Sequence, residues 1–336
     1  MTAISRRRLG AFSAAGAIGL LAAACSSSEA EDPAQSGASD DGGDAASVTI
    51  EDNDGEKTIA LPVQSVVATD NRTFETLDAW GVPLTAAAVS LMPSTIGYVE
   101  DDSIVDLGTH NEPDLEAIVA AQPDVVVNGQ RFTQFQEDIE KLVPDATVLS
   151  LDPRDGEDFF EELKRQVAVL GEVFSKQTEA TALGEGLQAQ IDRVMAAYDP
   201  AQTVMAVITS GGEIGYSAPG NGRTFGPMFP TLGLTPALEV PESSDDHQGD
   251  DVSVEAIAQS NPSWLLVMDR DAAVSADDPA YQPAAAVLEA SEALASVTAV
   301  AEGNIVYMPA DTYTNEGIQT YTEFFAAFAD ALEGTA

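Results

Sequence analysis

Two stretches of the sequence share one pattern: residues 115–131, LEAIVAAQPDVVVNGQR, and residues 254–270, VEAIAQSNPSWLLVMDR. In both, a proline follows the glutamate by seven residues and an arginine follows the proline by eight. Each stretch predicts a short helix that begins with an acid and stops before the proline, then a strand, then a basic residue. The continuous apolar run of each strand is typical of a parallel strand that is covered on both faces.

This repetition predicts two similar lobes. Open α/β sheets hold their ligands at the carboxyl ends of their strands, so we expect Arg131 and Arg270 to reach a shared cleft. Glu116 and Glu255 fall in the first turn of the two predicted helices, where a carboxylate offsets the helix dipole. Their equivalence also fits a pair of acidic contacts for a basic, two-fold partner, and the residues alone leave both interpretations open.

Composition narrows the class of protein. A length of 336 residues favours two domains, and 44% hydrophobic residues are ample for folding. The 14 basic and 56 acidic residues give a net charge of −42, which argues against nucleic acid as a partner because phosphates would be repelled. One cysteine and two histidines supply no disulfide framework and few ligands for a bare metal ion.

The N-terminus predicts export and lipid anchoring. Residues 1–24 read as a signal peptide, with arginines at positions 6–8 followed by an uncharged apolar stretch. Residues 21–25, LAAAC, resemble the lipobox of bacterial lipoproteins, whose cysteine is acylated, and the paired arginines resemble a twin-arginine signal, with Sec export also open. Cys25 and the polar residues up to 46 would then form a lipidated, flexible tether to the outer face of the cytoplasmic membrane.

The rest of the chain predicts an α/β fold. Residues 47–172 and 200–336 alternate strand and helix signals, which indicates an N-terminal and a C-terminal lobe. Strand signals are absent between residues 155 and 198, where helical periodicity is divided near Ser175, and we expect residues 173–199 to form a connecting helix. The predicted architecture is two Rossmann-like lobes, with parallel-rich central sheets flanked by helices, joined by a long strut helix.

Cations are scarce, so their positions are informative. Four arginines lie in loops just after predicted strands, namely Arg72, Arg131, Arg223 and Arg270. In a doubly wound lobe such loops lie along one edge, and their planar, permanently charged guanidinium groups suit carboxylates, phenolates and phosphates. The alternative is that each arginine pairs with one of the many nearby acids.

The neighbouring sequence indicates an environment for three further residues, His247, Tyr313 and His110. His247 lies in an acidic loop shortly before the second copy of the pattern, and by itself it fits a solvated loop histidine. Tyr313 precedes the last predicted helix and by itself fits a packing residue. His110 precedes Glu112 and Pro113, and we expect it at the surface.

Taken together, the sequence resembles the iron-siderophore-binding lipoproteins of ABC importers, which have the two-lobe, class III solute-binding fold. The resemblance covers essentially all of the mature chain. Its carriers are PDLE at 113–116, QPDVVV at 122–127, GQR at 129–131, RTFG at 223–226, SVE at 253–255, VMDR at 267–270 and DTY at 311–313. The most similar branch binds ferric catecholate siderophores.

The resemblance implies roles for individual residues. Arg131, Arg223 and Arg270 match three arginines that surround the anionic catecholate oxygens, although the first two are displaced by about one residue from the usual motifs. His247 and Tyr313 match segments that complete iron coordination in some relatives. The ligand would be the iron-siderophore complex, with no other cofactor. In the same family, two lobe glutamates dock the ABC permease dimer, which assigns that role to Glu116 and Glu255. Arg72 rests on its loop position alone.

Other functions fit the sequence less well. Haem or a corrinoid is an alternative ligand for the same fold. A surface adhesion or interaction protein would share the anchor but would not need the arginines. No Gly-x-Ser-x-Gly elbow, Walker phosphate loop or histidine base paired with a nucleophile occurs, so we expect no enzyme activity.

Overall fold

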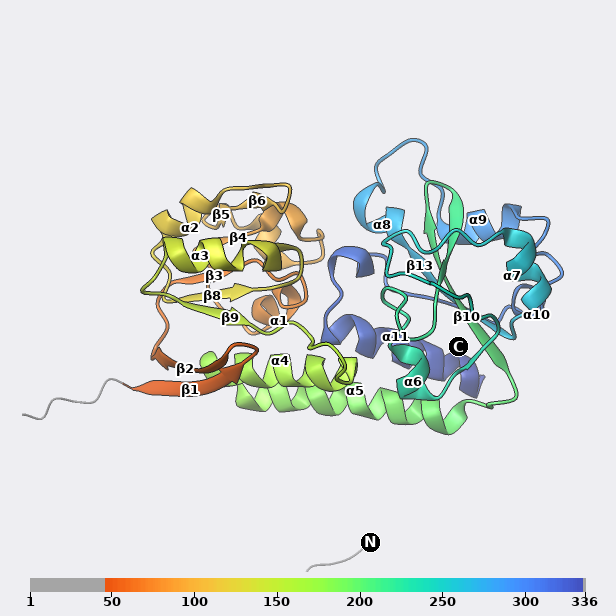
Figure 1. Ribbon diagram of the computed structural model, residues 1–336, viewed down its shortest axis with the longest axis horizontal. Helices are drawn as coiled ribbons and strands as arrows, with labels where there is room; N and C mark the ends of the chain where they lie inside the picture. Colours follow the sequence, from red (N-terminus) through yellow and green to blue (C-terminus); the bar gives the residue numbers. More distant parts are fainter. Residues whose placement is uncertain (1–45, 335–336) are drawn as a thin grey trace, which may run out of the picture. The chain divides into compact units, whose positions relative to one another are not determined.

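Two β-sheets, one in each lobe, organise residues 46–334, the part of the chain that the computed structural model describes (Figure 1). The N-terminal sheet is parallel and has the order β5 (Val105–Asp106), β4 (Ala86–Ala87), β3 (Val66–Ala68), β8 (Val125–Asn128), β9 (Thr147–Ser150). The C-terminal sheet has the order β11 (Glu213–Ser217), β10 (Thr203–Ser210), β13 (Trp264–Asp269), β14 (Ile305–Tyr307), with β12 (Thr235–Pro236) beside β10. There, only β11 runs antiparallel to its neighbour. The predicted two-lobed α/β fold is confirmed.

Helices surround these sheets. Those of the N-terminal lobe are α1 (Phe74–Ala79), α2 (Leu115–Ala121) and α3 (Gln136–Leu142). Those of the C-terminal lobe are α6 (Met228–Leu232), α7 (Val254–Ser260), α8 (Arg270–Val274), α9 (Ala284–Ala290), α10 (Thr298–Glu302) and α11 (Ile318–Glu333). Two helices lead from one lobe to the other: α4 (Phe159–Val173) lies below the N-terminal sheet, and α5 (Gln177–Ala197) runs along the base of both lobes (Figure 1).

Small strands complete the fold. The hairpin of β1 (Ser47–Asp52) and β2 (Gly55–Ala60) turns at an Asn-Asp-Gly segment, where Gly55 has the positive φ that the turn requires. A second, shorter pair consists of β6 (Gly108–Thr109) and β7 (Glu112–Pro113). The predicted signal peptide, Cys25 and nearly all of the predicted tether lie outside the described residues.

The repeated pattern has the same backbone conformation in both lobes. At the start of α2, the Asp114 carboxylate accepts a hydrogen bond from the Ala117 amide, and at the start of α7 the Ser253 hydroxyl accepts one from Ala256. Both helices end on a residue in the left-handed region, Gln122 at φ 46° and Asn261 at φ 45°. A parallel strand, β8 or β13, then follows the proline in each copy.

Side chains alternate between two cores along the central strands. In β8, Val125 and Val127 contribute to a core that also contains residues of α4, α5 and α11, whereas Val126 faces a second core beneath α2 and α3. β13 divides in the same way, with Leu266 in the first core and Leu265 in a core of its own lobe. The first core is therefore common to both lobes.

Helix α5 connects the two lobes. α5 has 21 residues, a rise of about 31 Å, and it contacts α4, α6 and α11 (Figure 1). The break that separates α4 from α5 is at Ser175, which has φ 57°, as the sequence predicts. Helix α5 thus runs against elements of both lobes and fixes the base of the space between them. Within residues 46–334, none of the helices is both long and apolar enough to cross a bilayer.

Candidate ligand-binding site

Three arginines surround the ring of Tyr313, a residue of the 3-10 helix η4 (Thr312–Thr314). The guanidinium carbons lie 4.9 Å (Arg131), 4.9 Å (Arg223) and 4.7 Å (Arg270) from the ring centroid. These distances are within the range of cation–π attraction. Arg131 also donates a hydrogen bond of 2.9 Å to the Tyr313 carbonyl. Arg131 belongs to the N-terminal lobe and the other two arginines to the C-terminal lobe, so the cluster joins both lobes. We call Arg131, Arg223 and Arg270 the arginine triad.

The arginine triad lines a cavity of about 660 Å³ between the lobes. Among the described residues, its lining includes five basic residues and no carboxylate; the five are Arg131, Arg223, Arg270, His110 and His247. Leu91 and Met92 from one lobe and Val274 from the other supply apolar surface. A mixture of apolar wall and converging cations fits an anionic ligand that also has flat, apolar parts.

Arg131 and Arg270 reach the cavity as the repeated pattern predicts, because each follows the carboxyl end of a parallel strand, β8 or β13. Arg223 follows β11, which is antiparallel, so its loop does not leave from that edge. A tight turn carries it back instead: the Ser217 hydroxyl donates to the Arg223 carbonyl, and a Cβ on Gly222 would lie 2.3 Å from the Ala218 nitrogen. The close approach explains the glycines of this loop.

The charges of the arginine triad act on Tyr313. Burial would raise the pKa of its phenol, but the charges of Arg131 and Arg223 and hydrogen bonds from Arg131 and Arg270 lower the pKa below its ordinary value. The Nε atoms of all three arginines are buried without a hydrogen-bond partner among the described residues. The same is true of the Nε atom of Arg72, so all four arginines of the cleft share this feature.

Both histidines are near this cavity. The His247 ring lies 6.4 Å from the Tyr313 ring, centroid to centroid, and its side chain is half-exposed. His110, which we expected at the surface, is partly buried and lines the cavity. Burial and the charge of Arg131 lower the pKa of His110, so the neutral ring is favoured. The expectation for His110 is wrong because β6 and β7 form a hairpin that returns the chain to the cleft.

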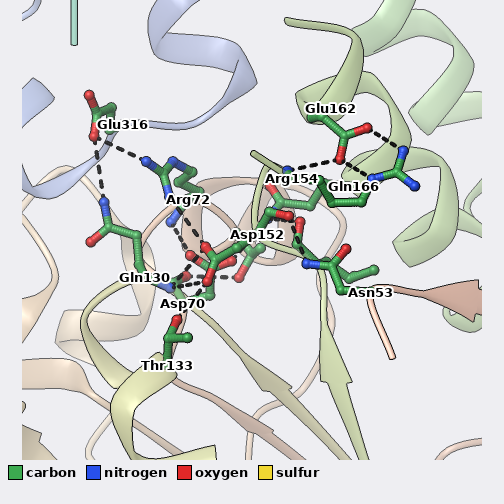
Figure 2. A network of polar contacts seen from close by, with 12 residues as sticks. Asn53, Asp70, Arg72, Gln130, Thr133, Asp152, Arg154, Glu162, Gln166 and Glu316 are labelled. Carbon is green, nitrogen blue, oxygen red and sulfur yellow. Dashed lines mark hydrogen bonds and ion pairs between the residues drawn. The ribbon is translucent and has the colours of Figure 1, made fainter. Parts of the chain in front are cut away.

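Arg72 lies in a different environment from the arginine triad. Its guanidinium forms ion pairs with Asp152 at 3.3 Å and Glu316 at 3.5 Å (Figure 2). It lines a separate cavity of about 850 Å³, which it shares with Arg131 and Arg223 on the other side. The alternative interpretation of each arginine, pairing with an acid, thus describes Arg72. It also applies to Arg223, which lies 3.8 Å from Glu316, and to Arg270, which lies 3.2 Å from Asp271.

Glu316 connects this network to the arginine triad. The carboxylate is 4% exposed and accepts hydrogen bonds from Thr224 at 2.6 Å and Tyr321 at 3.1 Å. Its other oxygen lies 3.5 Å from Arg72 and 3.8 Å from Arg223. Burial opposes ionisation, but these two arginines outweigh it and lower the pKa of Glu316.

Further contacts close the floor of the cleft. The Asn71 amide donates to the Thr314 carbonyl at 2.9 Å, and the Asn315 amide donates to Glu75 at 2.8 Å. The Thr76 hydroxyl donates to the Gln319 side chain at 3.0 Å. All of these bonds join the segment around α1 to the segment that leads into α11.

Glu116 and Glu255 occupy equivalent places, in the first turns of α2 and α7. Both side chains are exposed, and neither forms an ion pair with another residue in the range 46–334. The structure thus leaves both carboxylates available on the surface.

Sequence reasoning did not single out Glu316 or Asp271. Glu316 lies three residues after Tyr313, and Asp271 directly follows Arg270, so each is an acid next to a predicted site residue in the sequence. This proximity is the one sequence feature that could have indicated them. Which arginine each one contacts depends on tertiary structure.

The sequence matches the model of one protein family, described as periplasmic binding protein, over residues 66–312. The ferric-anguibactin-binding protein FatB of Vibrio anguillarum is 30% identical over 228 residues, which cover 67% of this chain and 69% of FatB. The petrobactin-binding protein YclQ of Bacillus subtilis is 25% identical over 293 residues, which cover 84% of this chain and 86% of YclQ.

Solved structures show the same fold. The periplasmic catecholate-siderophore binding protein VctP of Vibrio cholerae superimposes with a TM-score of 0.73 at 24% identity, covering 84% of this chain and 99% of VctP. The match extends over both lobes, since the family model begins at β3 and ends at η4. The chain belongs to the periplasmic binding protein family.

Proposed function

We propose that this protein is the solute-binding component of an ABC importer and that it captures a ferric siderophore, of the catecholate type, between its lobes. One observation carries the proposal: arginines from both lobes converge on one cavity whose lining has no carboxylate. Relatives named for ferric-anguibactin and petrobactin binding support it.

The charge of the cavity favours a chelated iron over a bare cation. Three guanidinium groups would repel a free metal ion, whereas a ferric catecholate is an anion that brings its own oxygen ligands. The flat catechol rings suit stacking on guanidinium groups, and their oxygens suit guanidinium N–H donors.

His247 and Tyr313 are proposed as iron ligands where the chelator leaves coordination positions open. Imidazole nitrogen and phenolate oxygen are both ligands for ferric iron, and the lowered pKa of Tyr313 favours the phenolate. The two ring centroids are 6.4 Å apart, and both residues line the same cavity.

We further propose that acylated Cys25 holds the protein in the bilayer on the outer face of the cytoplasmic membrane, after Tat or Sec export. Glu116 and Glu255 would then dock the permease dimer, one lobe to each subunit. Their equivalent positions and their exposure support this role. Arg72 is assigned to the inter-lobe network rather than to direct contact with the siderophore.

Calorimetric titration of the purified full chain tests the binding function. The panel consists of a ferric catecholate siderophore, its iron-free form, haem, cobalamin and zinc. We expect binding of the ferric complex and much weaker binding of the others. Preference for haem or cobalamin would support the alternative ligands, and equal binding of the iron-free siderophore would contradict the proposal.

A triple variant tests the arginine triad. Arg131→Ala, Arg223→Ala and Arg270→Ala together are expected to abolish measurable binding. The matched control removes three cations from outside the cavity, Lys141→Ala, Lys176→Ala and Arg193→Ala, which form ion pairs on the helical surface. Equal loss in both triple variants would point to overall charge instead of the site.

A further inference from the structure

We propose that two internal carboxylates, Glu316 and Asp271, set the charge of the cargo by each holding one member of the arginine triad. This inference rests on the proposed function and refines its substrate class. The site would prefer ferric complexes with a single negative charge over the more highly charged tris-catecholate complexes.

Glu316 is the carboxylate partner of Arg223. The ion pair measures 3.8 Å, and the carboxylate stays in place through hydrogen bonds from Thr224 and Tyr321. It is 4% exposed, so solvent screens its charge only weakly. Although it also contacts Arg72, that arginine has a second partner in Asp152 (Figure 2).

Asp271 is the carboxylate partner of Arg270. Its Oδ1 lies 3.2 Å from the Arg270 guanidinium, and its Oδ2 accepts a hydrogen bond from the Gly211 amide. The Ser210 hydroxyl contacts the same carboxylate at 3.3 Å. The Asp271 side chain is 17% exposed, so it too is largely protected from solvent.

Arg131 differs from the other two members of the arginine triad. Among residues 46–334 it forms no ion pair, and its guanidinium donates a hydrogen bond to the neutral Tyr313 carbonyl. Within the arginine triad, Arg223 and Arg270 therefore each have a carboxylate partner, Glu316 and Asp271, whereas Arg131 has none among the described residues. About one positive charge remains for the ligand, located mainly on Arg131.

The residual charge matches a particular class of chelate. A ferric ion held by two catecholates carries one negative charge, whereas one held by three catecholates carries three. The second complex would bring two extra negative charges close to Glu316 and Asp271, and at this range like charges in a partly buried site repel appreciably. The first complex also leaves two iron positions open, which His247 and Tyr313 are placed to fill.

Paired titrations test the inference. The full chain is titrated with a ferric bis-catecholate and a ferric tris-catecholate at the same ionic strength, and the ratio of the two dissociation constants is compared among variants. We expect wild type to favour the bis-catecholate. Glu316→Gln and Asp271→Asn, which are nearly isosteric, should each shift this ratio about tenfold towards the tris-catecholate.

The control variant is Glu137→Gln, which removes an exposed carboxylate of α3 that lines neither cavity of the cleft, and it should leave the ratio unchanged. A purely structural role for the two carboxylates would weaken both complexes equally. If Glu316→Gln fails to fold, Asp271→Asn carries the test alone, because Asp271 lies in the first turn of α8 and outside the buried core.

Three outcomes are distinguishable. A shifted ratio supports the inference. An unchanged ratio in Glu316→Gln and Asp271→Asn, or a wild type that prefers the tris-catecholate, overturns it while leaving iron-siderophore binding intact. Failure of wild type to bind either complex would overturn the proposed function itself.

Discussion

The environments of Arg72 and Arg131 illustrate how one residue type acquires two roles. Both follow a parallel strand of the N-terminal sheet, β3 or β8, and both face the space between the lobes. Arg72 is held between Asp152 and Glu316, whereas Arg131 forms no ion pair within the described residues and lies over the Tyr313 ring. The nearby acids, rather than the loop position, thus distinguish Arg72 from Arg131.

The largest effect is expected for Arg72→Ala. It would leave Asp152 and Glu316 without their shared cation in a buried setting, which costs about 3–5 kcal/mol of unfolding free energy. Urea unfolding followed by circular dichroism measures the change, with Lys141→Ala, an exposed cation, as the control. A loss below about 1 kcal/mol, as for a surface ion pair, would break the contrast between the two arginines.

For Arg131→Ala we expect a large loss of ligand affinity and a small loss of stability. Removing the unpaired member of the arginine triad should weaken binding of a ferric catecholate about 100-fold, since a charge-assisted contact in a desolvated site is lost. The unfolding free energy should change far less than in Arg72→Ala. Calorimetric titration and urea unfolding of the same preparation give both values. Unchanged affinity would show that the ligand does not reach Arg131.

The network around Arg72 should also respond to pH. Burial and the charge of Asp152 raise the pKa of Asp70 to about 7. The unfolded chain releases this proton near pH 4, so the folded state binds the extra proton between about pH 4 and pH 7. The stability that it contributes is complete below that window and is lost as the pH rises through it.

Asp70→Asn removes this titration. Relative to the variant, wild type should lose on the order of 2 kcal/mol of unfolding free energy between about pH 5 and pH 7. Urea unfolding across the pH range measures the difference between the two proteins. Parallel stability curves would show that Asp70 ionises as an ordinary carboxyl group.

A smaller effect is expected at Tyr313. Tyr313→Leu removes the ring on which three guanidinium groups lie and should weaken ferric catecholate binding about tenfold, whereas Tyr313→Phe keeps the ring. With a bis-catecholate, the Phe variant should additionally lose the visible absorption of a tyrosinate–iron bond. If the Leu and Phe variants bind a tris-catecholate equally well, the ring does not organise the arginine triad.

Local patterns predicted the architecture because each one has a local cause. The repeated pattern specifies helix, proline stop and buried strand in both lobes, and the periodicity of residues 155–198 specifies two helices with a break at Ser175. Boundaries were less accurate: the helix expected over residues 173–199 begins at Gln177, because the left-handed Ser175 ends the preceding turn.

The site was predictable only in part, because its contacts join residues far apart in the chain. Glu316 lies 3.5 Å from Arg72 although more than half of the sequence separates them, and no local signal pairs them. Arg223 reaches the cavity through a tight glycine turn after an antiparallel strand, not through the edge of a parallel sheet. His110 reaches it through a short hairpin.

The most direct test of the central claim is the position of iron in a crystal of the protein with a bound ferric catecholate, located by anomalous scattering. We predict iron in the cavity between the lobes, with ligand oxygens in contact with Arg131, Arg223 and Arg270. Iron outside that cavity, or a complex whose oxygens contact none of these arginines, would contradict the account.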